Sequence, residues 1–212
     1  MMHWHTVEGL LKDSLILLMK APEFSRFRLV GGTSLSLQIG HRMSADIDLF
    51  TDASYDSINF DIIDQFLVSH FNYVSASFGI HPGMGKSYII GVDKNNSVKI
   101  DIYYTDNFIQ PALVINNIRM ATIEEIIAMK VDVISRIGRK KDFWDLHELL
   151  DSYTIPQMIE LHKKRYPYSH NEEIIRKNFI DFVSADDDFN PICLKGKYWE
   201  LIKLDIVNAL EN

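Results

Sequence analysis

The feature that most constrains this chain is the run of residues 29–50, LVGGTSLSLQIGHRMSADIDLF. The run predicts a short apolar strand, a Gly-Gly turn, a short helix and a second strand that carries two carboxylates. Since side chains alternate between the faces of a strand, Asp46 and Asp48 point to one face and the apolar residue after each points into a core. Gly31 and Gly32 let the backbone approach a ligand, and a helix that begins there offers N–H groups to a phosphate. A phosphate cradle beside paired carboxylates predicts phosphoryl or nucleotidyl transfer.

A third acidic residue follows in the strand-forming run SVKIDIYY, residues 97–104. Asp101 shares one face of that run with Lys99 and Tyr103, whereas valine and isoleucine occupy the other face. If this strand lies next to the strand of the first two acids, the three carboxylates form a cluster of hard oxygen ligands that suits Mg²⁺ or Mn²⁺. The alternative is that Asp101 is simply the polar half of an edge strand.

Composition and charge exclude several other classes of protein. The chain has 212 residues, 47% of them hydrophobic, which is enough for one large core or two modest ones. Its single cysteine, Cys193, excludes an internal disulfide framework and suits a reducing cytosol, so we expect a cytoplasmic protein. No apolar run approaches about 18 residues, so we expect no membrane span, and the histidines lack the spacing of zinc ligands. The net charge of −7 argues against binding nucleic acid by bulk electrostatics, so any such contact must come from a local patch.

The predicted elements change character near residue 120. Helix-like and strand-like segments alternate up to residue 121, and the chain then reads as helical. We therefore expect a core domain over residues 1–121 and a helical domain over residues 122–212 that packs against it. In the first half, helices are expected at 6–20, 33–39 and 56–71, and strands at 27–30, 46–51, 73–78, 87–92, 98–104 and 113–120.

Local signals mark the helices of the second half. Thr122 with Glu125 forms a capping box that predicts a helix to about residue 137, and Ser169 with Glu172 predicts the start of another. The Asp-rich stretch 184–191 reads as a solvated loop.

The order of these motifs resembles a known superfamily. A GG[ST] turn, a short helix, a D-x-D strand and one acid on a later strand are similar to the polymerase-β-type nucleotidyltransferases. Within that superfamily, GGTSLSLQIGHRMSADIDLF resembles the AbiEii/AbiGii-type toxin nucleotidyltransferases of bacterial abortive-infection and toxin–antitoxin systems. Residues 128–146, AMKVDVISRIGRKKDFWDL, resemble the Lys and [KR]D-x-x-D helical motif of the same family. The resemblance implies an α+β fold, in which a mixed sheet flanked by helices is followed by a C-terminal helical bundle.

The resemblance also implies an activity and roles for residues. It implies a metal-dependent enzyme that transfers NMP from an NTP to a cellular acceptor and is restrained by a cognate antitoxin protein. The acceptor stays open between a tRNA 3′ end or another RNA, a protein hydroxyl and a small molecule. Asp46 and Asp48 would hold two Mg²⁺ or Mn²⁺ ions, and Asp101 would hold the catalytic ion and orient the nucleophile. Lys130 would bind phosphate, and Asp142 or Asp145 would position that lysine or the nucleotide. The residues that would contact the nucleotide or frame its pocket are Gly31, Gly32, Thr33, Ser34, Arg42 and Ser44.

Each of these residues has an alternative structural role. The hydroxyls of Thr33 and Ser34 suit helix capping, and Arg42 suits a surface ion pair with Asp52 or Asp56. Lys130 suits the solvated face of an amphipathic helix, and Asp142, Asp145 and His147 suit an exposed helical face. Seven basic residues form two short runs that predict a patch guiding an RNA end, unless they only solubilise helix ends. They are Arg136, Arg139, Lys140, Lys141, Lys163, Lys164 and Arg165.

Other functions remain open at this point. A D-x-D strand also occurs in phosphatases of the haloacid-dehalogenase kind and in metal-dependent glycosyltransferases, but neither explains the Gly-Gly helix start. Leu49 and Phe50 also stand where such a phosphatase has a small residue and a threonine. The non-enzymatic alternative is an inactive nucleotide-binding or antitoxin-like module of the same fold. Three intact acids count against it, because converging carboxylates repel one another without a cation.

Overall fold

Alternating apolar residues build the central strands of a seven-stranded sheet in the computed structural model, which describes residues 2–211. The order across the sheet is β3-β4-β5-β2-β1-β7-β6. β2 pairs in parallel with β5 and antiparallel with β1, so the sheet is mixed, as the predicted fold class requires. The strands are β1 (Arg28–Leu29), β2 (Asp46–Thr51), β3 (Tyr73–Ser75), β4 (Gly85–Gly91), β5 (Ser97–Tyr104), β6 (Leu113–Ile115) and β7 (Ile118–Met120).

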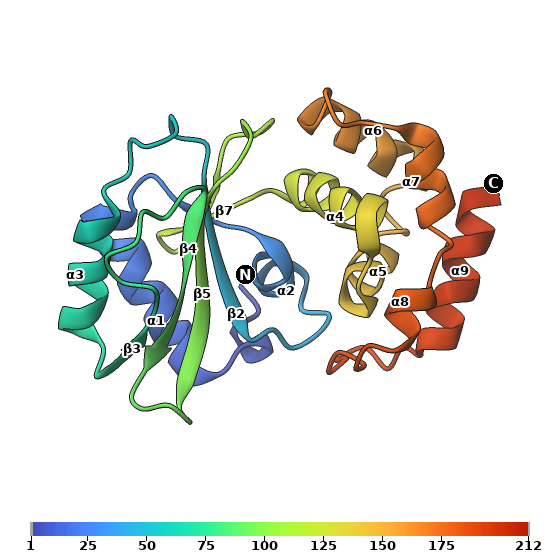
Figure 1. Ribbon diagram of the computed structural model, residues 1–212. Helices are drawn as coiled ribbons and strands as arrows, with labels where there is room; N and C mark the ends of the chain where they lie inside the picture. The colour runs from blue at the N-terminus through green and yellow to red at the C-terminus, as the bar shows by residue number, and fades with distance from the viewer. Residues whose placement is uncertain (1, 212) are drawn as a thin grey trace.

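Helices cover both faces of this sheet (Figure 1). α1 (Gly9–Lys20) and α3 (Phe60–His70) pack on one face, where a first hydrophobic core includes the inward residues of β2 and β5. α2 (Gly31–Ile39) lies on the other face, beside β2, and ends at Gly40 in the left-handed conformation that a C-terminal glycine adopts without strain. Two short 3₁₀ helices, η1 (Trp4–Thr6) and η2 (Pro22–Phe24), flank α1.

The second half of the chain is helical and encloses a second hydrophobic core (Figure 1). Val30 and Leu35, from the start of α2, belong to this second core, so α2 joins the two halves. Among the described residues no helix is long and apolar enough to cross a bilayer. The helices are α4 (Ile123–Ile137), α5 (Lys140–His147), α6 (Ile155–Arg165), α7 (Glu172–Asn178), α8 (Val183–Asp186) and α9 (Trp199–Glu211).

One expected strand is a hairpin. Residues 113–120 contain β6 and β7, which pair antiparallel around Asn116 and Asn117. Both asparagines have positive φ, 51° and 65°, as a two-residue hairpin turn of the primed type requires. The apolar residues on both sides hid this turn in the sequence.

Helix starts differ from the predicted ones where another cap is used. The side chain of Thr122 caps α4 as expected, by accepting a hydrogen bond from Glu125 N. Asn171, rather than Ser169, caps α7, and Asn59 caps α3, which therefore begins later than expected. The stretch 184–191 is not wholly a solvated loop, because it includes the end of α8 and Asp186 accepts hydrogen bonds from Trp199 and Lys203.

Candidate active site

The three predicted acids lie on one face of the sheet. β2 and β5 are paired in parallel with Asp48 opposite Asp101 and Asp46 opposite Lys99. The alternation predicted for both strands is confirmed, since the residues on either side of Asp48 in β2 and of Asp101 in β5 are buried on the opposite face. Asp46, Asp48 and Asp101 all line one cleft of about 530 Å³, whose other wall is helical.

The electrostatics of Asp48 show that its carboxylate is not fully compensated by the cations around it. The pKa of Asp48 is raised to about 6. Burial is the largest cause, and the nearby carboxylates of Asp101 and Asp46 add to it. Carboxylates that destabilise one another in this way gain from a cation, and oxygen donors are the ligands that Mg²⁺ and Mn²⁺ prefer. The donor set therefore fits a divalent metal ion, although among the described residues no three acidic, histidine or cysteine side chains already converge on one point.

This pKa predicts a dependence of stability on pH. Because the folded protein binds a proton at Asp48 more tightly than the unfolded chain does, the stability from this group is fully present below about pH 4 and is lost as the pH rises through 6. In Asp48→Asn that loss is absent. We expect the free energy of unfolding of metal-free Asp48→Asn to rise relative to that of wild type between pH 4 and pH 7, by up to about 3 kcal/mol.

Urea denaturation in a chelator at several pH values measures this difference. Asp13→Asn, on the exposed side of α1, is the control and should follow wild type. Parallel pH profiles for wild type and Asp48→Asn would show that Asp48 titrates normally.

Asp101 is held by two neighbours on the sheet. Ser87 Oγ donates to Oδ1 at 2.6 Å, and Lys99 Nζ donates to Oδ2 at 2.6 Å. The hydrogen bond to Asp101 raises the pKa of Lys99, and the charges of all three acids add to this effect. Neither Ser87 nor Lys99 was a predicted site residue, although the alternation of β5 already placed Lys99 on the face of Asp101.

The two glycines that begin α2 make room for charged side chains of the site. A Cβ at Gly31 would lie 2.5 Å from Asp48 Oδ2, and its φ of +67° also favours glycine. A Cβ at Gly32 would collide with the guanidinium of Arg42. Both glycines line the cleft. The sequence predicted a close approach to a ligand here, and the structure adds that the glycines let Asp48 and Arg42 reach the start of α2.

A buried ionic network supports the helical wall. Lys130 of α4 donates to Asp142 at 2.5 Å and lies 2.7 Å from Asp145 Oδ2, both on α5. Arg42, before β2, binds Asp145 through Nε at 2.6 Å and Nη2 at 2.8 Å. The ring of His41 adds a contact of 2.7 Å from Nε2 to Oδ1 of the same carboxylate.

Burial alone would raise the pKa of Asp145, but Lys130 and Arg42 hold it well below its usual range. Burial would likewise lower the pKa of Lys130, and Asp142 and Asp145 raise it instead. Both shifts favour the charged forms, so the network is ionic. Asp142, Asp145 and His147 are buried, and so are Arg42 and Lys130, so the alternative exposed positions for these side chains are wrong.

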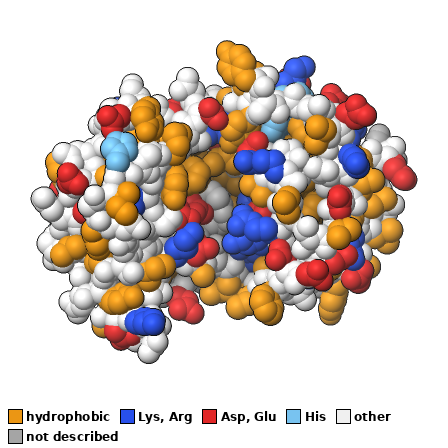
Figure 2. All heavy atoms as spheres, in the orientation of Figure 1, with side chains coloured by type: hydrophobic (Ala, Val, Ile, Leu, Met, Phe, Trp, Pro, Cys, Tyr) orange, Lys and Arg blue, Asp and Glu red, His pale blue; other side chains and the backbone are white. Residues whose placement is uncertain are grey.

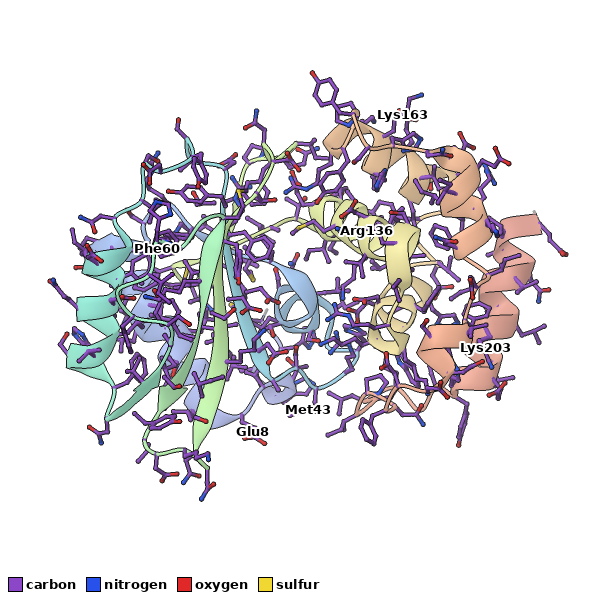
Figure 3. All side chains as sticks on the ribbon, viewed as in Figure 1. Glu8, Met43, Phe60, Arg136, Lys163 and Lys203 are labelled. Atoms are coloured by element: carbon purple, nitrogen blue, oxygen red, sulfur yellow. The ribbon has the colours of Figure 1, made fainter. Side chains whose placement is uncertain are left out.

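Three further cations face the acids across the cleft. Arg136 of α4 and Arg139 and Lys141 at the start of α5 line it, and Lys141 Nζ lies 3.8 Å from Asp46 Oδ2. Burial lowers the pKa of Lys141, and the charge of Arg139 lowers it further. Figure 2 shows the hollow between the two halves, with acidic side chains and a basic one on its sheet side and a larger group of basic atoms on its helical side. Nitrogen-bearing side chains fill the space between α2 and α5, and Arg136 marks the end of α4 (Figure 3).

Not all predicted site residues meet in this cleft. Ser44 lines it, but Thr33 and Ser34 are buried beside it and are not among its lining residues. The Thr33 hydroxyl donates to the carbonyl of Asp46 and lies 2.8 Å from Ser44 Oγ. The Ser34 hydroxyl accepts from Gln38 Nε2 at 3.1 Å. The Thr33 hydroxyl thus ties α2 to β2 and the segment before it, whereas the Ser34 hydroxyl bonds within α2.

The predicted basic patch is not continuous, because two of its members are buried. Arg165 donates to Glu125 Oε2 at 2.7 Å and to Thr105 Oγ1 at 3.0 Å, which fastens α6 to the segment after β5. Lys140 donates to the carbonyl of Asp188 at 2.6 Å. Neither is available to a nucleic acid. The exposed members fall into two groups, Arg136, Arg139 and Lys141 at the cleft and Lys163 and Lys164 on α6.

A late segment of the chain braces the site from outside. Residues 192–194, which we call the strap, pair antiparallel with residues 41–43. Met43 N donates to Ile192 O at 2.9 Å, and Leu194 N donates to His41 O at 2.9 Å. The strap therefore fixes the backbone that carries His41 and Arg42, which bind Asp145 together with Lys130.

Comparisons with known proteins identify a matching family and similar folds. A family model described as "Nucleotidyl transferase AbiEii toxin, Type IV TA system" matches residues 15–211. The Aquifex aeolicus (strain VF5) protein aq_aa25 is 28% identical over 208 aligned residues, which cover 88% of this chain and 89% of that protein. JHP933 from Helicobacter pylori shares the fold with a TM-score of 0.58 at 18% identity, over 94% of this chain and 88% of that one. The nucleotidyltransferase toxin MenT4 from Mycobacterium tuberculosis does so with a TM-score of 0.52 at 14% identity, over 93% and 84% of the two chains.

Proposed function

Because this chain belongs to the family of AbiEii nucleotidyl transferase toxins, we propose that it transfers a nucleoside monophosphate from an NTP to a cellular acceptor. The observation that carries the proposal is the opposition of charges across one cleft. Three carboxylates stand on the sheet wall, and Lys130, Arg139 and Lys141 stand on the helical wall. Acids that accept metal ions opposite cations that accept phosphates are what nucleotidyl transfer from a triphosphate requires.

The metal site would use the sheet wall. Asp46 and Asp48 would hold two Mg²⁺ or Mn²⁺ ions and Asp101 one of them, and the bound ions would supply charge neutralisation at the triphosphate and activation of the acceptor hydroxyl. The helical wall would bind the triphosphate through Lys130, Arg139 and Lys141. The N–H groups at the start of α2, from Gly32 onward, would add neutral donors.

The chain's own residues then account for the reaction. Asp101 orients the acceptor hydroxyl and takes its proton as the acceptor oxygen bonds to the α-phosphorus. The bond between that phosphorus and the pyrophosphate oxygen breaks, and the cations of the helical wall hold the pyrophosphate as its charge develops. Asp142 and Asp145 keep Lys130 charged and fixed in position. Arg42 and Ser44 frame the floor of the cleft.

We propose RNA as the acceptor. The exposed cations Arg136, Arg139 and Lys141 at the cleft support this assignment, because they offer a local attraction for phosphates on a protein whose net charge is −7. A tRNA 3′ end is a suitable acceptor because its terminal nucleotides are single-stranded and carry free hydroxyls. The description of the family as a toxin–antitoxin system supports a separately encoded antitoxin as the partner that restrains the enzyme.

Incubation with each labelled NTP, Mg²⁺ and total cellular RNA tests the activity and the acceptor together. We expect label from one or more NTPs to enter RNA of tRNA size and a chelator to prevent it. Digestion with RNase and with protease identifies the labelled species. Label in protein or in small molecules would replace RNA as the acceptor, and the absence of label from every species would contradict nucleotidyl transfer.

A further inference from the structure

Lys99 occupies an unusual position for a cation, within the row of acids. On the cleft face of β2 and β5, Asp46 lies beside Lys99 and Asp48 lies beside Asp101. Lys99 and Asp101 are two residues apart on one strand, so their side chains also lie on the same face. The lysine thus stands at one corner of a group whose other three corners are the acids of the site.

The ammonium of Lys99 contacts an oxygen that a metal ion would need. Nζ lies 2.6 Å from Asp101 Oδ2, while Ser87 Oγ lies 2.6 Å from Oδ1. Both oxygens of Asp101 therefore already accept a hydrogen bond from a neighbouring side chain. A divalent ion that binds Asp101 meets one positive charge on that carboxylate and must compete with it.

The side chain of Lys99 is able to move away. It is 46% exposed, whereas Lys130, the cation at the centre of the helical wall, is 7% exposed and is held by two carboxylates. A half-exposed lysine on a flexible four-carbon stem exchanges one partner for water or another anion at small cost. The pair of Lys99 and Asp101 is thus a replaceable contact, unlike the buried network across the cleft.

We propose that Lys99 is a built-in counter-ion of the acidic cluster, which holds Asp101 in the metal-free protein and is displaced when a divalent ion binds that carboxylate. The inference rests on the metal site of the proposed function. It makes Lys99 a positioning residue that lowers the affinity of the protein for metal in the absence of nucleotide.

Titration of the metal-free protein with Mn²⁺ tests this role without any activity measurement. The electron paramagnetic resonance signal of the free ion reports how much Mn²⁺ remains unbound. We expect Lys99→Met to bind Mn²⁺ about five- to tenfold more tightly than wild type, because the competing ammonium is gone. Lys99→Arg keeps the charge and should bind no more tightly than wild type. Lys94→Met, in the exposed turn between β4 and β5, removes the same charge from the protein and is the matched control.

A second measurement separates competition from general charge effects. In a chelator, Lys99→Met should melt below wild type and Lys94→Met should not, because only the first change leaves Asp101 without its cation. Equal Mn²⁺ affinities for wild type, Lys99→Met and Lys94→Met would overturn the role of Lys99 and leave the metal site intact. Weaker Mn²⁺ binding by Lys99→Met than by wild type would show that Lys99 favours metal binding, which also overturns the counter-ion role. Failure of every variant to bind Mn²⁺ would reject the metal site and the counter-ion role together.

Discussion

Asp48→Asn is expected to lower the rate of nucleotidyl transfer by about three orders of magnitude, because it removes a charge at the centre of the acidic cluster that the proposed metal site requires. The substitution is nearly isosteric, and Asp48 lies on the surface of a strand whose neighbouring residues form the core. The burial that raises the pKa of Asp48 also means that its charge costs the folded state stability near neutral pH. The variant should therefore lose activity and still melt no lower than wild type.

Initial rates of label transfer and thermal unfolding at pH 7 measure the two effects. Asp52→Asn is the matched control, since it changes an acid directly after β2 that does not line the cleft. In cells that lack the cognate antitoxin, Asp48→Asn should also relieve the growth arrest that wild type causes. Transfer at the wild-type rate by Asp48→Asn would remove the acids from the mechanism. Growth arrest that persists in this variant would trace the toxicity to another part of the protein.

Asp145→Asn is expected to have the largest effect on stability, about 3–5 kcal/mol of unfolding free energy. Asp145 is fully buried and binds Arg42, Lys130 and His41. An amide at this position leaves two buried cations facing an uncharged group, and the desolvation cost of both cations remains. Since Arg42 precedes β2 and Asp145 lies on α5, the variant should also weaken the attachment of the two halves.

Urea denaturation measures the loss, and Asp205→Asn is the control. The carboxylate of Asp205 also pairs with a histidine, His147, but its side chain is 55% exposed, so we expect a change below about 1 kcal/mol. Similar small losses for both variants would show that the buried network is not a source of stability. Lys130→Met with Asp145→Asn should cost less than the sum of the two single changes, because the pair shares one interaction.

The sheet wall of the site could be predicted because short-range rules determine it. Alternation identified β2 at its observed bounds and placed Asp46, Asp48 and Asp101 on common faces. The one long-range assumption, that the two strands are neighbours, is also correct. It is made because three acids can share one ligand only if their strands lie side by side. Glycine and threonine signals gave the end of α2 and the start of α4.

The helical wall could not be predicted in the same way. Charged residues near helix ends are usually solvated, so a sequence does not distinguish exposed Lys163 from buried Arg165 in the same run. The difference depends on Glu125, which lies 40 positions away and meets Arg165 only in the folded chain. Likewise, the pairing of Arg42 with Asp145 spans 103 positions, and no local pattern encodes it. Asn116 and Asn117 are a different case, because asparagine pairs are a known turn signal that the surrounding apolar residues concealed.

The position of the strap late in the sequence affects the order in which the parts of the site form during translation. A ribosome completes all three acids when it passes residue 101, but the partners that brace Arg42 emerge only with residues 192–194. Contacts between such distant positions form late and slowly, because a long loop must close first. A nascent chain thus carries the three acids of the cleft from residue 101 to residue 192 without the strap that completes the site. For a member of a family of toxins, the last part of translation is then the step at which the complete cleft first exists.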